Sequence, residues 1–201
     1  MSNERRRYTK RRRAQSEQQT RQRITEAAVA LHETLGPART TISAIAEKAG
    51  VQRATVYRHF PDDESLFAAC SGHFRAMNPP PDPAALREVS DPAARLRRAL
   101  TDTYAYYGRT EAMAENVFRD APLVEAMAKP VAMRRAYSDA FLDAVVASRP
   151  ERGHARRRIK AAIAHALSFP TWRSLVREQG LGDDEAVALM AGMVEAAGGV
   201  R

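Results

Sequence analysis

Six residues in the first third of the chain have side chains suited to contact a nucleic acid. They are Arg53, Ala54, Thr55, Tyr57, Arg58 and His59. Arginine can donate two hydrogen bonds to guanine, while alanine or a threonine methyl group can touch the methyl group of thymine. Hydroxyl and imidazole groups can reach phosphates or base edges. Such a set predicts a DNA-reading surface, which requires one element that presents these side chains together.

The surrounding residues have the pattern of two short helices joined by a sharp turn. Thr41 is a suitable N-cap, and Gly50 suits a helix end in the left-handed conformation. Between them, apolar residues recur at the spacing of one helical face: Ile42, Ile45, Ala46 and Ala49. The second helix is expected over residues 53–60, with Val56 and Phe60 on its inner face. The pattern predicts a helix-turn-helix whose second helix enters the DNA major groove.

The N-terminal third also resembles the TetR family of bacterial transcriptional regulators, over roughly residues 20–70. The resemblance rests on Arg23-Ile24, Ala27-Ala28, Gly36, Thr41-Ile42, Ile45-Ala46, Ala49-Gly50-Val51, Thr55-Val56-Tyr57-Arg58-His59-Phe60 and Leu66. It implies an all-α protein, with a three-helix DNA-binding domain and a helical domain for effector binding and dimerisation. The residues expected to contact DNA are Thr41, Ser43, Arg53, Ala54, Thr55, Tyr57, Arg58 and His59.

The chain departs from the family at the start of the fourth helix. Members often have a lysine there that binds a phosphate, whereas this chain has Asp62, Asp63 and Glu64. Acidic residues suit the dipole at a helix N-terminus. That phosphate contact is therefore not expected here.

Charge is concentrated at the N-terminus. The chain has a net charge of +8, of which residues 1–23 carry +7. We expect residues 1–18 to form a flexible basic arm that contacts DNA. Its cations are Arg5, Arg6, Arg7, Lys10, Arg11, Arg12 and Arg13. Insertion into the minor groove and a solvated tail without specific contacts are both open alternatives.

The remaining organisation is read from helical periodicity and proline positions. The predicted domains are a DNA-binding domain over 19–76, a proline-rich linker over 77–91 and a helical effector-binding and dimerisation domain over 92–201. Helices are expected at 19–35, from Asp62, from Pro92 past Tyr107, at 111–119, 123–148 and 151–168, and from Asp183 to near Gly198. Small residues on the last two helices, with the resemblance, predict a homodimer through them.

Large soft and aromatic side chains gather in the second domain and predict a pocket for a small apolar or aromatic effector. The candidate residues are Tyr104, Tyr107, Met113, Phe118, Arg119, His165, Phe169 and Trp172. For any one of them, ordinary core packing is the competing interpretation. Pro170 is expected to interrupt a helix and leave a gap beside Trp172.

Other classes of function find less support. The sequence has no phosphate-binding loop and no nucleophile motif, so we expect no enzyme, no metal and no cofactor. It has no long apolar stretch and a single Cys70, which favour a cytoplasmic, nucleoid-associated protein. The expected function is that of a sequence-specific transcriptional regulator, and the resemblance to the family implies a repressor that a small-molecule effector releases. An architectural DNA-binding protein with little sequence preference is the alternative, and operator, effector and target genes stay undetermined.

Overall fold

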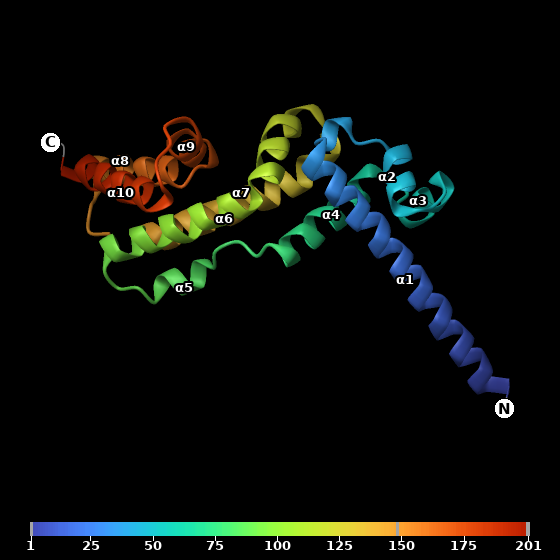
Figure 1. Ribbon diagram of the computed structural model, residues 1–201. Helices are drawn as coiled ribbons and strands as arrows, with labels where there is room; N and C mark the ends of the chain where they lie inside the picture. The colour runs from blue at the N-terminus through green and yellow to red at the C-terminus, as the bar shows by residue number, and fades with distance from the viewer. Residues whose placement is uncertain (1, 148, 200–201) are drawn as a thin grey trace. The chain divides into compact units, whose positions relative to one another are not determined.

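The protein is described by a computed structural model over residues 2–147 and 149–199, and every regular element in these ranges is a helix (Figure 1). The expected all-α class is therefore confirmed. The chain divides into two compact units. Unit 1 comprises Met1–Met77 and Glu115–Val131, and unit 2 comprises Asn78–Ala114 and Ala132–Arg201.

Unit 1 is built around four helices that pack on a small apolar core. Its elements are α1 (Ser2–Thr34), η1 (Pro37–Arg39), α2 (Ile42–Ala49), α3 (Arg53–His59), α4 (Asp63–Met77), η2 (Ala121–Leu123) and η3 (Glu125–Met127). Ile24 and Ala28 of α1 meet Ile45 of α2, Val56 of α3 and Leu66 of α4 in one buried cluster. This core fixes the recognition segment, which consists of α2 and α3, because each helix around the core contributes at least one buried side chain.

The first helix begins much earlier than expected. The sequence predicts a flexible arm over residues 1–18, but α1 is helical from Ser2. This stretch contains neither proline nor glycine and is rich in arginine and glutamine, which are good helix formers. It also extends an existing helix, so no new nucleus has to form. The high charge and low hydrophobicity of this stretch indicate only that it buries little apolar surface. An existing helix can continue without such burial.

The turn between α2 and α3 follows the expected local chemistry. The Thr41 hydroxyl accepts a hydrogen bond from the Ala44 N–H at 3.2 Å and caps α2. Gly50 ends that helix in the left-handed region, at φ 64°. Its N–H bonds the carbonyl of Glu47, and the Val51 N–H bonds the carbonyl of Ala46 at 2.9 Å. A residue with a Cβ would be strained at this position.

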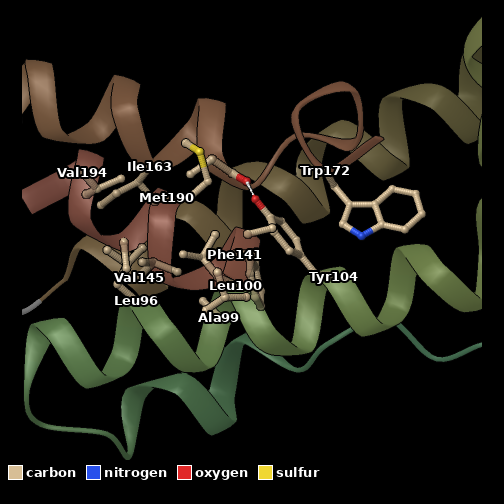
Figure 2. Close-up of a cluster of buried hydrophobic side chains, with 14 of the residues drawn as sticks. Leu96, Ala99, Leu100, Tyr104, Phe141, Val145, Ile163, Trp172, Met190 and Val194 are labelled. Atoms are coloured by element: carbon tan, nitrogen blue, oxygen red, sulfur yellow. Dashed lines mark hydrogen bonds between the residues drawn. The ribbon is translucent and has the colours of Figure 1, made fainter. Parts of the chain in front are cut away.

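Unit 2 is a bundle of longer helices. Its elements are α5 (Pro83–Arg87), α6 (Pro92–Asp120), α7 (Ala128–Val146), α8 (Gly153–Ala166), α9 (Phe169–Arg173), the π-helical turn η4 (Ser174–Glu178) and α10 (Asp183–Gly199). The end of α6 from Glu115 and the start of α7 as far as Val131 belong to unit 1. The core gathers Leu96 and Leu100 of α6 with Val145 of α7, Ile163 of α8 and Val194 of α10 (Figure 2).

Prolines start helices in this unit where the sequence suggested that they break them. The stretch expected to be a linker contains α5, with Asp82 as its N-cap and Pro83 in its first turn. Pro130 lies in the first turn of α7, which begins at Ala128 rather than near residue 123. Pro170 lies in the first turn of α9 behind the Ser168 cap. First-turn N–H groups have no partner within the helix, so proline is tolerated there.

The two helices expected over 92–107 and 111–119 are one continuous helix, α6. Gly108 lies between them and does not interrupt it. A single glycine inside a helix costs only about 1 kcal/mol relative to alanine. The long apolar face of α6 in the core of unit 2 outweighs that cost.

Candidate nucleic-acid interface

The recognition segment presents most of its predicted contact residues to solvent. Val56 is fully buried against α1 and α2, whereas Arg53, Ala54, Tyr57 and Arg58 are exposed on α3. Tyr57 keeps 46% of its surface exposed although it is a large ring. An exposed aromatic side chain between arginines on a short, well-positioned helix is typical of a binding surface rather than a core.

The start of α2 adds two further side chains. Thr41 and Ser43 are both exposed. Because the Thr41 oxygen already accepts the Ala44 N–H, its orientation is fixed, and its hydroxyl hydrogen stays available to donate to a phosphate. Ser43 lies in the first turn of α2, where free N–H groups also favour an anion.

Two of the predicted α3 residues are less accessible. Thr55 and His59 are half-buried. The His59 Nε2 is buried and has no hydrogen-bond partner within the described chain. Burial, followed by the neighbouring charges of Arg58 and Arg21, lowers the pKa of His59. We therefore place His59 at the inner edge of the surface, where it shapes the end of α3 more than it offers a polar group to a base.

Arg21 of α1 holds the C-terminal end of α3, and sequence reasoning had counted it only as a charge. Its guanidinium group donates to the carbonyl oxygen of His59 and lies 4.0 Å from the centre of the Phe60 ring. A cation that bonds the last carbonyls of a helix stabilises that end. The position of Arg21 in the sequence could have indicated this contact. Arg21 precedes Ile24 and Ala28 by three and seven residues, so it lies on the side of α1 that faces the core.

The basic residues of the expected arm lie on the first turns of α1 and are exposed. The structure places Arg6, Arg7, Lys10, Arg11, Arg12 and Arg13 there, while the side chain of Arg5 lies outside what it describes. The guanidinium of Arg12 is 5.8 Å from the ring centre of Tyr8. The cations are thus displayed on a helix at its N-terminal half (Figure 1).

The acidic residues at the start of α4 make internal contacts. Asp62 accepts the Ser65 N–H at 2.7 Å and so caps the helix, and this bond lowers the pKa of its carboxyl group. Glu64 forms an ion pair with Lys129, from the start of α7. These acids stabilise the fold of unit 1, which accounts for their presence where a phosphate-binding lysine is common.

Within unit 1, residues at the end of α6 make polar contacts with the C-terminal end of α1. The Asn116 amide donates to the carbonyl oxygens of His32, at 3.1 Å, and Glu33, at 2.7 Å. It therefore caps the C-terminus of α1. The Arg119 guanidinium donates to the carbonyl of Leu35 at 3.2 Å and pairs with Asp120 at 2.6 Å. Residues 115–120 thereby attach to the helix that supports the DNA-binding surface.

A buried histidine and a glycine complete this attachment. His32 stacks on Phe67 with ring centres 5.0 Å apart, and burial lowers its pKa to about 4. Gly36 has φ 91°, and a Cβ there would lie 2.1 Å from the Arg119 side chain and 2.3 Å from the Asp120 carboxylate. Glycine is thus required both by backbone conformation and by the close approach of that ion pair.

The predicted effector residues do not form one group. Tyr104, Tyr107, Phe169 and Trp172 pack together in unit 2, with the Tyr107 ring centre 5.3 Å from Phe169 and 5.8 Å from Trp172. Met113 is buried and His165 is exposed in the same unit. The other two, Phe118 and Arg119, belong to unit 1.

The ring cluster is closed and its polar atoms are bonded. The Tyr104 hydroxyl donates to the Ala166 carbonyl at 3.0 Å, as Figure 2 shows, and the Tyr107 hydroxyl donates to Leu167 at 2.7 Å. The Trp172 indole N–H donates to Asp183 at 3.1 Å, and the side chain has no exposed surface. The expected gap beside Trp172 is absent here, because Pro170 begins α9 instead of interrupting a helix.

Comparison with known proteins agrees with this geometry. The family model described as bacterial regulatory proteins, tetR family, matches residues 24–70, which contain the helix-turn-helix. No helix among the described residues is long and apolar enough to cross a membrane. No curated protein sequence matches the chain.

Solved structures of similar fold span nearly the whole chain. A TetR-like transcriptional regulator from Rhodococcus sp. RHA1 is 20% identical, with 88% of this chain and 93% of that chain covered, at a TM-score of 0.62. NalD, the secondary repressor of the MexAB-OprM multidrug efflux pump in Pseudomonas aeruginosa, is 19% identical, with 91% and 97% covered, at 0.65. A TetR transcription regulator from Haloarcula marismortui ATCC 43049 is 18% identical, with 90% and 97% covered, at 0.57.

The fold is all-α, and its N-terminal part holds a helix-turn-helix with an exposed second helix. Residues 24–70 match the family model of bacterial regulatory proteins, tetR family, and the fold of the whole chain is similar to that of TetR-like regulators.

Proposed function

We propose that this protein binds a specific operator and represses transcription until a small molecule releases it. The observation that carries the proposal is the exposed face of α3. Arg53, Ala54, Tyr57 and Arg58 project from a helix whose inner side is fixed by the buried Val56. Bidentate and apolar contacts from such a face discriminate bases in the major groove.

Selection of bound sites from a random pool of duplexes tests the first part. A regulator of this kind should enrich a palindrome, because two copies of α3 related by a two-fold axis read two half-sites about one helical turn apart. The enriched duplex should bind at least about a thousandfold more tightly than random duplex at the same salt concentration. If the two bind almost equally, the protein is an architectural DNA-binding protein with little sequence preference.

We propose that two copies associate through the outer faces of α8 and α10. The described residues exposed there are apolar, and most of them are small: Ala161, Ala164, Ala188, Leu189, Gly192, Met193 and Ala196. Leu189 and Met193 leave 44% and 56% of their surface uncovered. Ala191, which also lies on α10, faces the core of its own chain and is not part of this surface.

The effector is proposed to bind in unit 2 at the ring cluster around Tyr107 and Trp172. Since that cluster is closed, the ligand must select a conformation in which some of the rings separate. An apolar or aromatic molecule fits the chemistry of the lining, and the Tyr107 hydroxyl and Asp183 carboxylate offer polar anchors. For comparison, the similar structure NalD is named as a repressor of a multidrug efflux pump.

A screen that follows Trp172 fluorescence and operator release together tests the effector proposal. Linkage requires that operator DNA weaken ligand binding by the factor by which ligand weakens DNA binding. A compound that changes the fluorescence and leaves operator affinity unchanged would show a binding site without regulation. We propose that the protein acts by binding and has no catalytic activity. We also propose that it is located in the cytoplasm at the nucleoid, because the operator is part of the chromosome.

A further inference from the structure

The basic half of α1 has a defined face. Arg6, Lys10 and Arg13 follow one another at spacings of four and three residues, so they lie along one side of the helix. Arg21 falls on the same side as Lys10, because it follows Lys10 by 11 residues, close to three whole turns. All four are exposed. We call Arg6, Lys10 and Arg13 the basic stripe.

Arg21 sets the direction of this stripe relative to the recognition helix. Its guanidinium group stacks on Phe60 at 4.0 Å and donates to the carbonyl of His59, the last residue of α3. Phe60 is only 2% exposed, so this contact is anchored in the core of unit 1. The stripe therefore runs along the side of α1 that meets the C-terminal end of α3.

Positive charge far exceeds negative charge in the segment that carries the stripe. Residues 6–19 are all exposed, and Glu17 is the single acid between Arg6 and Arg23. Like charges face one another four residues apart in Arg6 and Lys10 and in Arg7 and Arg11, which destabilises a helix. Cations near a helix N-terminus also oppose the helix dipole. A polyanion placed along this side would remove each of these repulsions.

We infer that the basic stripe docks as a rigid helix along the phosphate backbone of the duplex that flanks the half-site read by α3. This inference rests on the proposed function. With a rise of about 1.5 Å per residue, the stripe begins about 12 Å from Arg21 and ends about 22 Å from it. A duplex presents one phosphate per about 1.7 Å of axis, so each stripe cation finds a phosphate within reach.

The composition of the segment favours duplex over a membrane surface. An interfacial helix needs an apolar side that inserts among lipid chains. Residues 6–19 contain only Tyr8 and Ala14 as apolar or aromatic residues, and these do not form a side. The stripe is also continuous with the exposed recognition surface, through Arg21. Charge and position thus both indicate DNA.

Two matched pairs of variants of the full-length protein test the inference on the selected operator with duplex flanks of about ten base pairs, one helical turn. Gln15→Pro breaks α1 between the stripe and Arg21 without a change of charge, and Gln15→Ala is its control. The triple change Arg6→Gln, Lys10→Gln and Arg13→Gln removes the stripe. Its control, Arg7→Gln, Arg11→Gln and Arg12→Gln, removes equal charge from other sides.

Docking as a helix predicts that Gln15→Pro weakens operator binding at least fivefold near 0.1 M salt, whereas Gln15→Ala changes it less than twofold. Removal of the stripe should lower the slope of log affinity against log salt by about 2–3 per protomer, at ~0.9 per phosphate contact, and the control triple by less than about 1. Trimming the flanks to the bare operator should abolish both differences. Thermal unfolding of each variant should stay unchanged, because these side chains are outside the core.

The inference is overturned if Gln15→Pro binds like Gln15→Ala, or if both triple variants lower the slope equally. Either result would show a flexible polycation in place of a docked helix, while preference for the operator over random duplex would still support the proposed function. Loss of that preference in the unmodified protein would overturn the proposed function and the docking beside a half-site with it. Binding to vesicles of anionic phospholipid that depends on the stripe, with no stripe effect on duplex, would also overturn it.

Discussion

The carboxylate of Asp120 accepts a hydrogen bond from the backbone N–H of Ala38 at 3.0 Å, across 82 residues of sequence. Asp120 is only 2% exposed, and its second partner is the Arg119 guanidinium at 2.6 Å. The bond to Arg119 and the bond to Ala38 lower the pKa of this carboxyl group. One buried acid thereby ties the end of α6 to the segment that leads into the helix-turn-helix.

Replacement of Asp120 should therefore destabilise unit 1. In Asp120→Ala, the Ala38 N–H and the Arg119 guanidinium lose a part-buried acceptor, and we expect a loss of about 1–3 kcal/mol in the free energy of unfolding. Asp102 offers a control, since its ion pair with Arg98 is largely exposed. Asp102→Ala should cost about 0.5 kcal/mol or less. Urea unfolding of both variants checks the comparison, and equal losses would contradict it.

Gly36 and Gly50 form a second matched pair, because both have positive φ, at 91° and 64°. A Cβ at Gly50 meets nothing within 4 Å, whereas one at Gly36 collides with Arg119 and Asp120. Gly50→Ala should cost about 1 kcal/mol from backbone strain alone. Gly36→Ala should cost at least about 1 kcal/mol more, since it also disrupts the partly buried ion pair of Arg119 and Asp120. Thermal unfolding that ranks Gly50→Ala as the more harmful change would refute this account.

His32 predicts a pH dependence of stability. Burial lowers its pKa from 6.5 to about 4, so the unfolded chain takes up a proton at a higher pH than the folded chain. The free energy of unfolding should therefore fall as the pH drops from about 6.5 to 4, by about 3 kcal/mol in total. His32→Gln should flatten this part of the pH profile.

The exposed His154 on α8 provides the control for that measurement. His154→Gln should leave the slope between pH 6.5 and 4 as it is in the unmodified protein. Unfolding in urea at four or five pH values across the window is sufficient. A slope that survives in His32→Gln would assign the effect to other groups.

Arg53 should contribute to base discrimination. Arg53→Ala should weaken binding to the selected operator by about 1–3 kcal/mol and relax the preference at one base pair. Arg23, which is exposed on α1 and lies outside the helix-turn-helix, serves as the control and should leave that preference unchanged on substitution by alanine. Competition between operator and random duplex measures both. If Arg53→Ala weakens both duplexes by the same factor, Arg53 contacts only the backbone.

Met193 tests the proposed dimer surface. Met193→Arg places a charge on the apolar face of α10 and should produce a monomer at micromolar concentration in sedimentation. Met133 on α7 is equally exposed, at 56%, and Met133→Arg should remain a dimer. A monomer of the unmodified protein would remove the two-fold arrangement and the palindrome that depends on it.

Local chemistry explains which parts of the fold were predictable. Thr41, Gly50 and Val56 act through their immediate neighbours, so cap, turn and inner face could be read from the sequence. The contact of Arg21 with His59 joins residues 38 apart and depends on how α1 crosses α3. Such a contact follows from packing, which spacing along the chain only suggests.

The errors have equally physical causes. A charged segment with few apolar residues was expected to be flexible, yet α1 continues through it because helix propagation needs no core. The proposed effector residues were grouped by type, and the fold places Phe118 in one unit and Trp172 in the other. Composition gives the number of rings available for a pocket. It does not say whether those rings are packed against one another, as Tyr107 and Trp172 are.

The early start of α1 has a consequence for how the protein finds DNA. Residues 1–23 carry a net +7 and the other 178 residues together carry +1, so the net charge is concentrated in the N-terminal part of the chain, which α1 carries. A duplex acts on this part with a torque before any contact forms, and so orients the approaching molecule. Added salt shortens the range of that torque. Encounters should then become slower, while complexes already formed with the recognition helix in place lose less of their lifetime.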